Sequence, residues 1–343
     1  MIGEFVQKHY SYLIESSSME TKINLCLLIA CYSDHILNPS ENQDLAADCF
    51  RFILESVNIK DEEAACLIQT AAKTLEILFK KDSLSSFLVP YAVDALRVLT
   101  EIFLENGEES IMNVILEILA NYELQILEQP DFLAEFMKTS ATKIEEGLQK
   151  EKCTGDEGVK LENMRDLLQK IFQRKQYILM LQDDLEQVIQ PLLALLQEFY
   201  INNKRDTIKH RHLLNLLIPL LPAVKNLTQT LLNDISQAFP LVIEITHSLS
   251  YLFFKLSDII KDTNAIAEFN KNPETLQLLI EIVIKAFHHK NSFDRSKLIC
   301  QGALLFQLIF QYVDSFTEVH IEKILETTCQ LLKTTFNPPT RVQ

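Results

Sequence analysis

The stretch Glu108–Leu127, EESIMNVILEILANYELQIL, decides the fold of this chain. Its apolar residues recur at the i, i+3, i+4, i+7 spacing: Ile111, Val114, Ile115, Ile118, Leu119, Tyr122 and Ile126. Side chains at this spacing line one face of an α-helix, because the helix turns once every 3.6 residues. The stretch therefore predicts an amphipathic helix over residues 108–127.

The same pattern recurs from end to end, and no run of strict alternation marks a strand. It predicts helices at 2–16, 19–36, 41–57, 61–81, 86–106, 108–127, 130–149, 160–181, 183–203, 207–221, 223–237, 240–261, 273–289, 293–313 and 317–335. Asn106-Gly107 is typical of a helix end, since glycine adopts the left-handed conformation that closes helices.

Paired helices begin near residues 2, 41, 86 and 130, a period of about 40 residues that is typical of HEAT-type repeats. The sequence thus predicts an all-α fold, an α-solenoid of stacked antiparallel helix pairs (HEAT-like repeats) with about 15 helices. A plain helical bundle is the alternative, but that architecture is usually built from far fewer helices.

Composition excludes several other classes of protein. The 343 residues include only six glycines and no tryptophan. So few glycines argue against a barrel, a sandwich or a Rossmann fold, and they leave no glycine-rich phosphate loop. The longest unbroken apolar run, Leu25–Tyr32, is far shorter than the roughly 20 residues of a membrane helix. The N-terminus also lacks the pattern of a secretory signal.

Charge divides the chain at Gly158. Residues 1–158 hold 28 acidic and 12 basic side chains, a formal charge of −16, whereas residues 159–343 hold 19 and 20. We therefore expect two parts. Residues 1–158 would form acidic HEAT-like repeats that end in an acidic loop, Lys150–Gly158, and residues 159–343 would continue the repeats with a near-neutral charge.

The acidic half predicts a surface that attracts a basic partner and repels nucleic acid, which prefers a basic stripe. Nine carboxylates are the candidate partner-binding residues: Glu101, Glu105, Glu108, Glu109, Glu145, Glu146, Glu151, Asp156 and Glu157. A further acidic cluster is Asp61-Glu62-Glu63. The alternative is that these side chains form a solvated face that keeps a leucine-rich protein soluble.

Reactive groups do not converge in the sequence, so we expect no enzyme, no cofactor and no metal site. There is no HExxH or GxSxG motif, and no two of the seven cysteines have CxxC spacing. The neighbours Asp183 and Asp184 would point about 100° apart on a helix. Cys26 and Cys31 lie in an apolar stretch that predicts a buried position for both, whereas Cys153 lies in a polar loop.

The run Leu88–Phe136, LVPYAVDALRVLTEIFLENGEESIMNVILEILANYELQILEQPDFLAEF, resembles the middle of the importin-beta (karyopherin) superfamily, nearest its importin seven/eight branch. The matching pieces are Pro90, the Glu105–Ser110 turn, Asn113-Val114-Ile115 and Asn121-Tyr122-Glu123. The resemblance covers residues 20–222, and the acidic loop falls where those receptors carry one.

This resemblance implies a segment of a nuclear transport receptor that binds basic protein cargo on a concave acidic surface. It also implies the small GTPase Ran and nucleoporins as partners, a location in cytoplasm and nucleus, and Ran-gripping repeats before Met1. It transfers no individual contact residue, because the matching motifs are structural. The alternative is an α-solenoid scaffold subunit of another multiprotein assembly, which would bind through hydrophobic patches.

Overall fold

A computed structural model describes residues 2–16, 18–37, 39–150, 155–182, 184–201, 207–221, 223–224, 227–237, 246–261, 273–288, 295–313 and a few positions between 321 and 329. Every regular element in these ranges is helical. The chain divides into two compact units, Met1–Leu167 and Leu168–Gln343. This division reflects packing, whereas the predicted division at Gly158 reflects charge.

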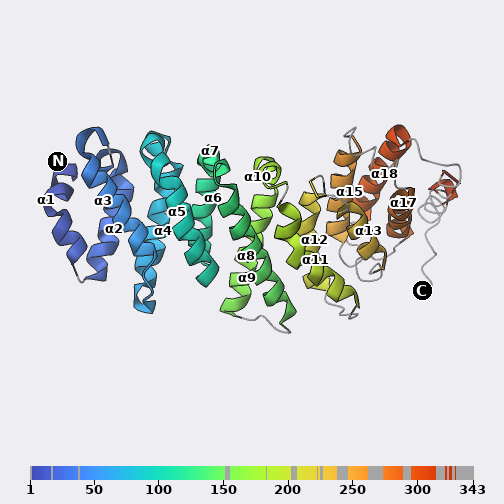
Figure 1. Cartoon of the computed structure of the whole chain (residues 1–343), viewed down its shortest axis with the longest axis horizontal. Helices are drawn as coiled ribbons and strands as arrows, with labels where there is room; N and C mark the ends of the chain where they lie inside the picture. The colour runs from blue at the N-terminus through green and yellow to red at the C-terminus, as the bar shows by residue number, and fades with distance from the viewer. Residues whose placement is uncertain are drawn as a thin grey trace, which may run out of the picture. The chain divides into compact units, whose positions relative to one another are not determined.

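The first unit is a stack of antiparallel helix pairs (Figure 1). Its helices are α1 (Ile2–Glu15), α2 (Met19–Ile36), α3 (Pro39–Val57), α4 (Ala65–Lys80), α5 (Ser85–Asn106), α6 (Glu109–Asn121), α7 (Glu123–Leu127), α8 (Pro130–Gln149) and most of α9 (Asp156–Phe172). The helices α1, α3 and α5 pack against α2, α4 and α6 respectively. The second members, α2, α4 and α6, also pack side by side as one row.

The second unit repeats this arrangement. Its helices are α10 (Lys175–Met180), α11 (Leu185–Ile201), α12 (Thr207–Leu217), α13 (Leu227–Gln237), α15 (Thr246–Ile260), α17 (Pro273–His288) and α18 (Arg295–Tyr312). Helix α15 packs along α18 and α13 along α17, while α17 and α18 also touch. The predicted fold class, all-α with stacked antiparallel helix pairs, is therefore confirmed. The predicted helix at 317–335 lies mostly outside the described residues.

The apolar stripe that decided the fold forms the core of the row. All seven of its residues are buried, each with at most 2% of its surface exposed. Tyr122 packs edge-on against Phe79 of α4, with 5.4 Å between the ring centroids. Burial of such side chains is the main favourable term in folding, at about 1.5–3 kcal/mol each. The stripe therefore explains why α6 docks on α4.

Two predicted helices are interrupted, and the helix expected over 223–237 begins later, at Leu227. The helix expected over 108–127 is interrupted at Tyr122, whose backbone (φ −123°, ψ 35°) separates α6 from α7. The helix expected over 160–181 begins earlier, at Asp156, and breaks at Gln173-Arg174. The apolar periodicity of the sequence continues across both interruptions, because buried residues lie on either side of each. The pattern therefore does not reveal where the helix breaks.

The predicted loop Lys150–Gly158 is correspondingly too long. Gly155 has a φ of 68°, and α9 follows it immediately. Asp156 and Glu157 stand in the first helical turn, where carboxylates interact favourably with the helix dipole. Residues 151–154, which include Cys153, lie outside the described part of the chain.

The predicted burial of the two α2 cysteines is half right. Cys26 is fully buried, whereas Cys31 is exposed. The two positions differ by five residues, which turns Cys31 away from the core-facing stripe of the helix. An apolar stretch alone does not distinguish these two directions.

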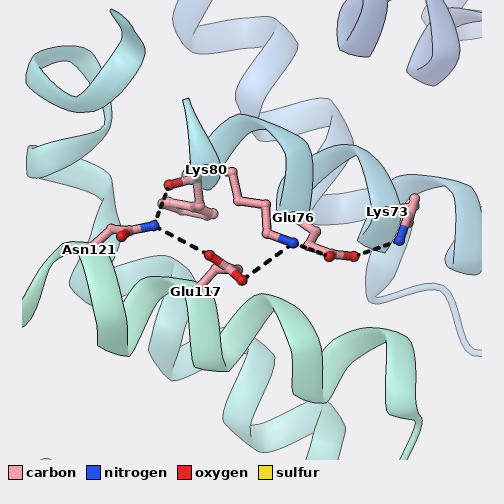
Figure 2. Close-up of polar contacts among 6 residues, drawn as sticks. Lys73, Glu76, Lys80, Glu117 and Asn121 are labelled. Atoms are coloured by element: carbon pink, nitrogen blue, oxygen red, sulfur yellow. Dashed lines mark hydrogen bonds and ion pairs between the residues drawn. The ribbon is translucent and has the colours of Figure 1, made fainter. Parts of the chain in front are cut away.

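A polar network ties α4 to α6 (Figure 2). Glu76 pairs with Lys73 at 3.0 Å and with Lys80 at 2.6 Å, and only 11% of its side chain is exposed. Lys80 also reaches Glu117 of α6 at 3.3 Å, and the Asn121 amide donates to Glu117 at 3.4 Å. The charges in this cluster balance, so its surface is locally neutral although the first half of the chain is strongly acidic.

Candidate partner-binding edge

Three acidic connections of the first unit meet at one edge of the helix stack. Because consecutive long helices run in opposite directions, every second connection between them lies on the same side, with the short α7 counted as part of the α6–α8 connection. The α3–α4 connection at 58–64, the α5–α6 turn at 107–108 and the α8–α9 connection share one side in this way. In Figure 1 the end of α8 and the start of α9 lie at the lower edge of the view.

We call this surface the acidic edge. Its carboxylates, taken from the described residues, are Asp61, Glu63, Glu105, Glu108, Glu109, Glu145, Glu146, Asp156 and Glu157.

A tight turn at Gly107 positions Glu108 and Glu109, which lie in the middle of the acidic edge. Gly107 has a φ of 66°, which L-residues rarely adopt, and its amide donates to the Phe103 carbonyl at 2.8 Å to close α5. The Asn106 side chain accepts a hydrogen bond from the Glu108 amide at 3.3 Å. The predicted helix end at Asn106-Gly107 is confirmed, and Glu108 and Glu109 consequently begin α6.

Helices α8 and α9 are fastened to the end of α5. The Lys143 ammonium of α8 donates to the Leu104 carbonyl at 2.9 Å, and the Lys160 ammonium of α9 donates to the Glu105 carbonyl. The Asn163 amide donates to the Gly107 carbonyl at 2.8 Å. The last carbonyls of a helix lack partners within it, so these donors satisfy them and add positive charge at the negative helix end.

Glycines allow this close approach. A Cβ atom at Gly107 would lie 2.8 Å from the Lys160 Cα, and one at Gly147 of α8 would lie 2.7 Å from a methyl carbon of Leu161. Both distances are shorter than real Cβ contacts, so a side chain at either position would displace α9. Two of the six glycines in the chain therefore fix where the acidic start of α9 sits.

The lysines partly neutralise the edge. Lys60 bridges the α3–α4 connection to Glu105 at 3.0 Å, and Lys150 pairs with Glu157 at 3.6 Å. Burial lowers the pKa of Lys160, and the nearby ammonium of Lys143 lowers it further, against the opposing effect of Glu105. Exposed ion pairs such as Lys60–Glu105 contribute little to stability. The nine carboxylates of the acidic edge outnumber the four lysines that lie among them, at 60, 143, 150 and 160.

The structure brings most of the predicted site residues together. Glu105, Glu108 and Glu109 surround the α5–α6 turn, Glu145 and Glu146 lie in the last two turns of α8, and Asp156 and Glu157 open α9. Glu101 is exposed one turn before the end of α5. Glu151 lies outside the described residues. The carboxylates thus stand at helix ends along one edge rather than on the sides of the helices.

The sequence identifies Asp61 and Glu63 as an acidic cluster but does not place them with the candidate residues of this edge. Asp61 and Glu63 belong to it because Lys60 joins their connection to Glu105. The lysines at 60, 143, 150 and 160 were not predicted to take part. Counting the connections between helices would have placed Asp61 and Glu63 at this edge, since alternate connections lie on the same side of the stack. The capping lysines leave no such signal, because their partners are backbone carbonyls of another helix.

Across the described ranges, no group of three or more His, Cys, Asp or Glu side chains is arranged to hold a metal ion. None of the helices described is both long and apolar enough to span a membrane. Comparison with known proteins finds no matching family model, no matching curated protein and no matching solved structure.

Proposed function

We propose that this chain is a non-enzymatic helical-repeat protein whose acidic edge binds a basic protein partner. One observation carries the proposal: connections far apart in the sequence meet at a single edge and are joined there by Lys60–Glu105 and Lys160–Glu105 contacts. Their carboxylates are therefore gathered along one edge of the stack. The negative field of such a group accelerates encounter with a positive partner and selects against a negative one.

Fixed geometry supports binding over simple solvation. Long acidic side chains scattered on separate helices would keep the chain in solution equally well. Here Gly107 and Gly147 leave room for α9 beside the α5–α6 turn. Lys160 and Asn163 hold α9 there, and Lys143 holds α8 to the end of α5. Keeping like charges close together costs free energy, which a basic partner would offset by neutralising them.

Within this class we propose a nuclear transport receptor, or a segment of one. The resemblance of Leu88–Phe136 to the importin-beta superfamily supports this, as does the stack of helix pairs in each unit. The partner would then be basic cargo, with Ran and nucleoporins as further ligands and activity in cytoplasm and nucleus. No direct contact with nucleic acid or membrane is expected.

A scaffold subunit of another assembly is the second candidate, favoured by the surface of α18. Lys297 is exposed near its start, but from Cys300 onward its exposed side carries no charge and presents Cys300, Ala303, Leu304, Gln307, Phe310, Gln311 and Tyr312. Uncharged helix faces of this kind are typical of permanent protein contacts. In that case binding would depend on the second unit, and reversing charges on the acidic edge would have little effect.

Matched charge reversals separate the two candidates. Glu108→Lys with Glu109→Lys alters the acidic edge at the start of α6. Glu128→Lys with Asp131→Lys makes the same net change at the start of α8, on the opposite side of the stack. All four side chains are exposed.

Each form would be used to retain proteins from nuclear and cytosolic extracts at two salt concentrations, with and without GTP-locked Ran. The receptor proposal predicts basic proteins that are lost only with the edge variant and at higher salt. Release by Ran would support the transport assignment. A salt-resistant complex retained equally by all forms would overturn the edge proposal and favour the scaffold.

A further inference from the structure

We propose that the exposed face of the α2–α4–α6 row binds an extended peptide segment that carries an aliphatic side chain next to an acidic one. This surface borders the acidic edge, since Ser110 directly follows Glu109, but its chemistry is different. It extends along the sides of the three helices, and its occupant would present an acidic side chain to Lys73.

A cavity of about 390 Å³ lies in this face. Its apolar wall is formed by Leu27, Ala30 and Ile77, and Leu27 keeps 49% of its surface exposed. The remaining lining residues are Gln69, Thr70, Lys73, Thr74 and Ser110. An aliphatic side chain would bury apolar surface against the first group, which is favourable at about 25 cal/mol per Å².

One buried polar atom of the cavity lacks a partner. The Ser110 hydroxyl is inaccessible and makes no hydrogen bond among the described residues. A buried hydroxyl left without a partner costs about 1–3 kcal/mol. Because this oxygen is covered, a peptide carbonyl or amide could pair with it only if the cavity wall moves aside.

Three side-chain amides stand near the same level of the row. Asn24 of α2 and Gln69 of α4 are exposed, and Asn113 of α6 is partly exposed. Asn24 is one helical turn before Leu27, and Asn113 one turn after Ser110, so both share a side with cavity residues. No hydrogen bond to another described residue engages any of these three amides.

Contacts between the helices fix this level. Thr74 donates to the Cys26 carbonyl and Lys81 to the Ser33 hydroxyl, so α4 is aligned with α2 at an offset of 48 residues. Asn121 donates to the Phe79 carbonyl, which aligns α6 with α4 at an offset of 42. At 1.5 Å per residue, the three amides therefore lie within about 4.5 Å of one another along the helix axis.

Their spacing across the row fits an extended chain. Packed helix axes are about 8–10 Å apart, and an extended peptide advances about 3.3 Å per residue. One amide would thus meet the backbone about every third residue. A carboxamide offers both a donor and an acceptor, so it can pair with the N–H and C=O of a peptide whatever its side chains are.

Charge selects the neighbouring side chain. Lys73 is the only charged residue among those that line the cavity. Its ammonium contacts Glu76 at 3.0 Å but keeps 67% of its side chain exposed, and Glu76 is already paired with Lys80. Lys73 can therefore accept a second carboxylate from the peptide. A basic residue at that point would be repelled.

The test uses a library of capped nonapeptides with a central leucine and varied flanking residues, measured by fluorescence anisotropy. The intact chain should select Asp or Glu beside the leucine. Lys73→Glu should reverse that preference to Lys or Arg. Gln69→Ala and Asn113→Ala should each weaken binding about fivefold, the effect of one or two hydrogen bonds. Circular dichroism would verify that each variant is folded.

An acidic-edge variant away from the cavity, Glu146→Lys with Asp156→Lys, should bind these peptides as the unchanged chain does, which separates this proposal from the proposed function. The inference is overturned if no library peptide binds the intact chain. It is equally overturned if the Lys73→Glu chain selects the same peptides as the unchanged one.

Discussion

Replacing Gly107 with alanine tests how α9 is held against the α5–α6 turn. The substitution has two costs. Alanine at a φ of 66° is strained by about 1–2 kcal/mol, because its Cβ approaches the carbonyl oxygen. That Cβ would also lie 2.8 Å from the Lys160 Cα, an overlap with backbone that costs about 1–3 kcal/mol further. We therefore expect a total loss of about 2–5 kcal/mol.

Gly155→Ala is the matched control. Gly155 has nearly the same backbone conformation, with a φ of 68°, but a Cβ there would meet nothing within 4 Å. It should lose only the conformational part, about 1–2 kcal/mol. The difference between the two variants isolates the contact of the turn with α9.

Urea unfolding of the full chain would give the total loss, and hydrogen exchange of residues 156–172 would locate it. Because the chain has two units, its unfolding need not be a single transition, so the local measurement carries more weight. Gly107→Ala should speed exchange along the whole of α9, while Gly155→Ala should affect at most its first turn, whose amides bond to the Gly155 carbonyl. Equal losses for both variants, with unchanged exchange in α9, would refute the packing described.

Three further predictions concern the first unit. Ile115→Ala removes a fully buried side chain and should lower the free energy of unfolding by about 2–5 kcal/mol. Leu124→Ala changes a side chain that is 74% exposed and should alter that free energy by less than about 0.5 kcal/mol. Similar melting curves for the two variants would contradict the core assignment. Burial alone raises the pKa of Glu76, but hydrogen bonds from two lysines outweigh it and the net shift is downward. The stability that this lowered pKa supplies is present at neutral pH and is lost as the pH falls through the folded-state pKa. The unfolding free energy of Glu76→Gln should therefore fall less steeply between neutral and acidic pH than that of the unchanged chain. Equal slopes for the two proteins would count against this prediction. Burial raises the pKa of Cys26 to about 12. Iodoacetamide at neutral pH should therefore label the exposed Cys31 and spare Cys26, which mass spectrometry would measure. Equal labelling of the two cysteines would disprove this prediction.

Helix positions were largely predictable because each helix carries its own periodic signal. The α6 stripe is an example, since every residue placed on its buried side is buried. The Asn106-Gly107 end was also predictable, because the left-handed conformation there favours glycine. The interruption at Tyr122 was not, since a buried tyrosine fits the periodic pattern whether or not the backbone bends at that point.

The acidic edge was predictable in composition but not in arrangement. The sequence identifies carboxylates near helix ends, yet their gathering depends on which connections share a side of the stack. The lysines at 143 and 160 donate to carbonyls of α5, a pairing between distant residues that no local pattern encodes. The exposure of Cys31 similarly depends on which side of α2 faces α4.

The salt dependence of binding tests the central claim most directly. A fluorescent peptide rich in lysine and arginine would be titrated with the unchanged chain, the Glu108→Lys/Glu109→Lys variant and the Glu128→Lys/Asp131→Lys variant over a range of salt concentrations. We predict tight binding that weakens steeply with salt for the unchanged chain and the second variant, and weak binding with a shallow salt dependence for the first. Identical curves for all three proteins would contradict a binding function of the acidic edge.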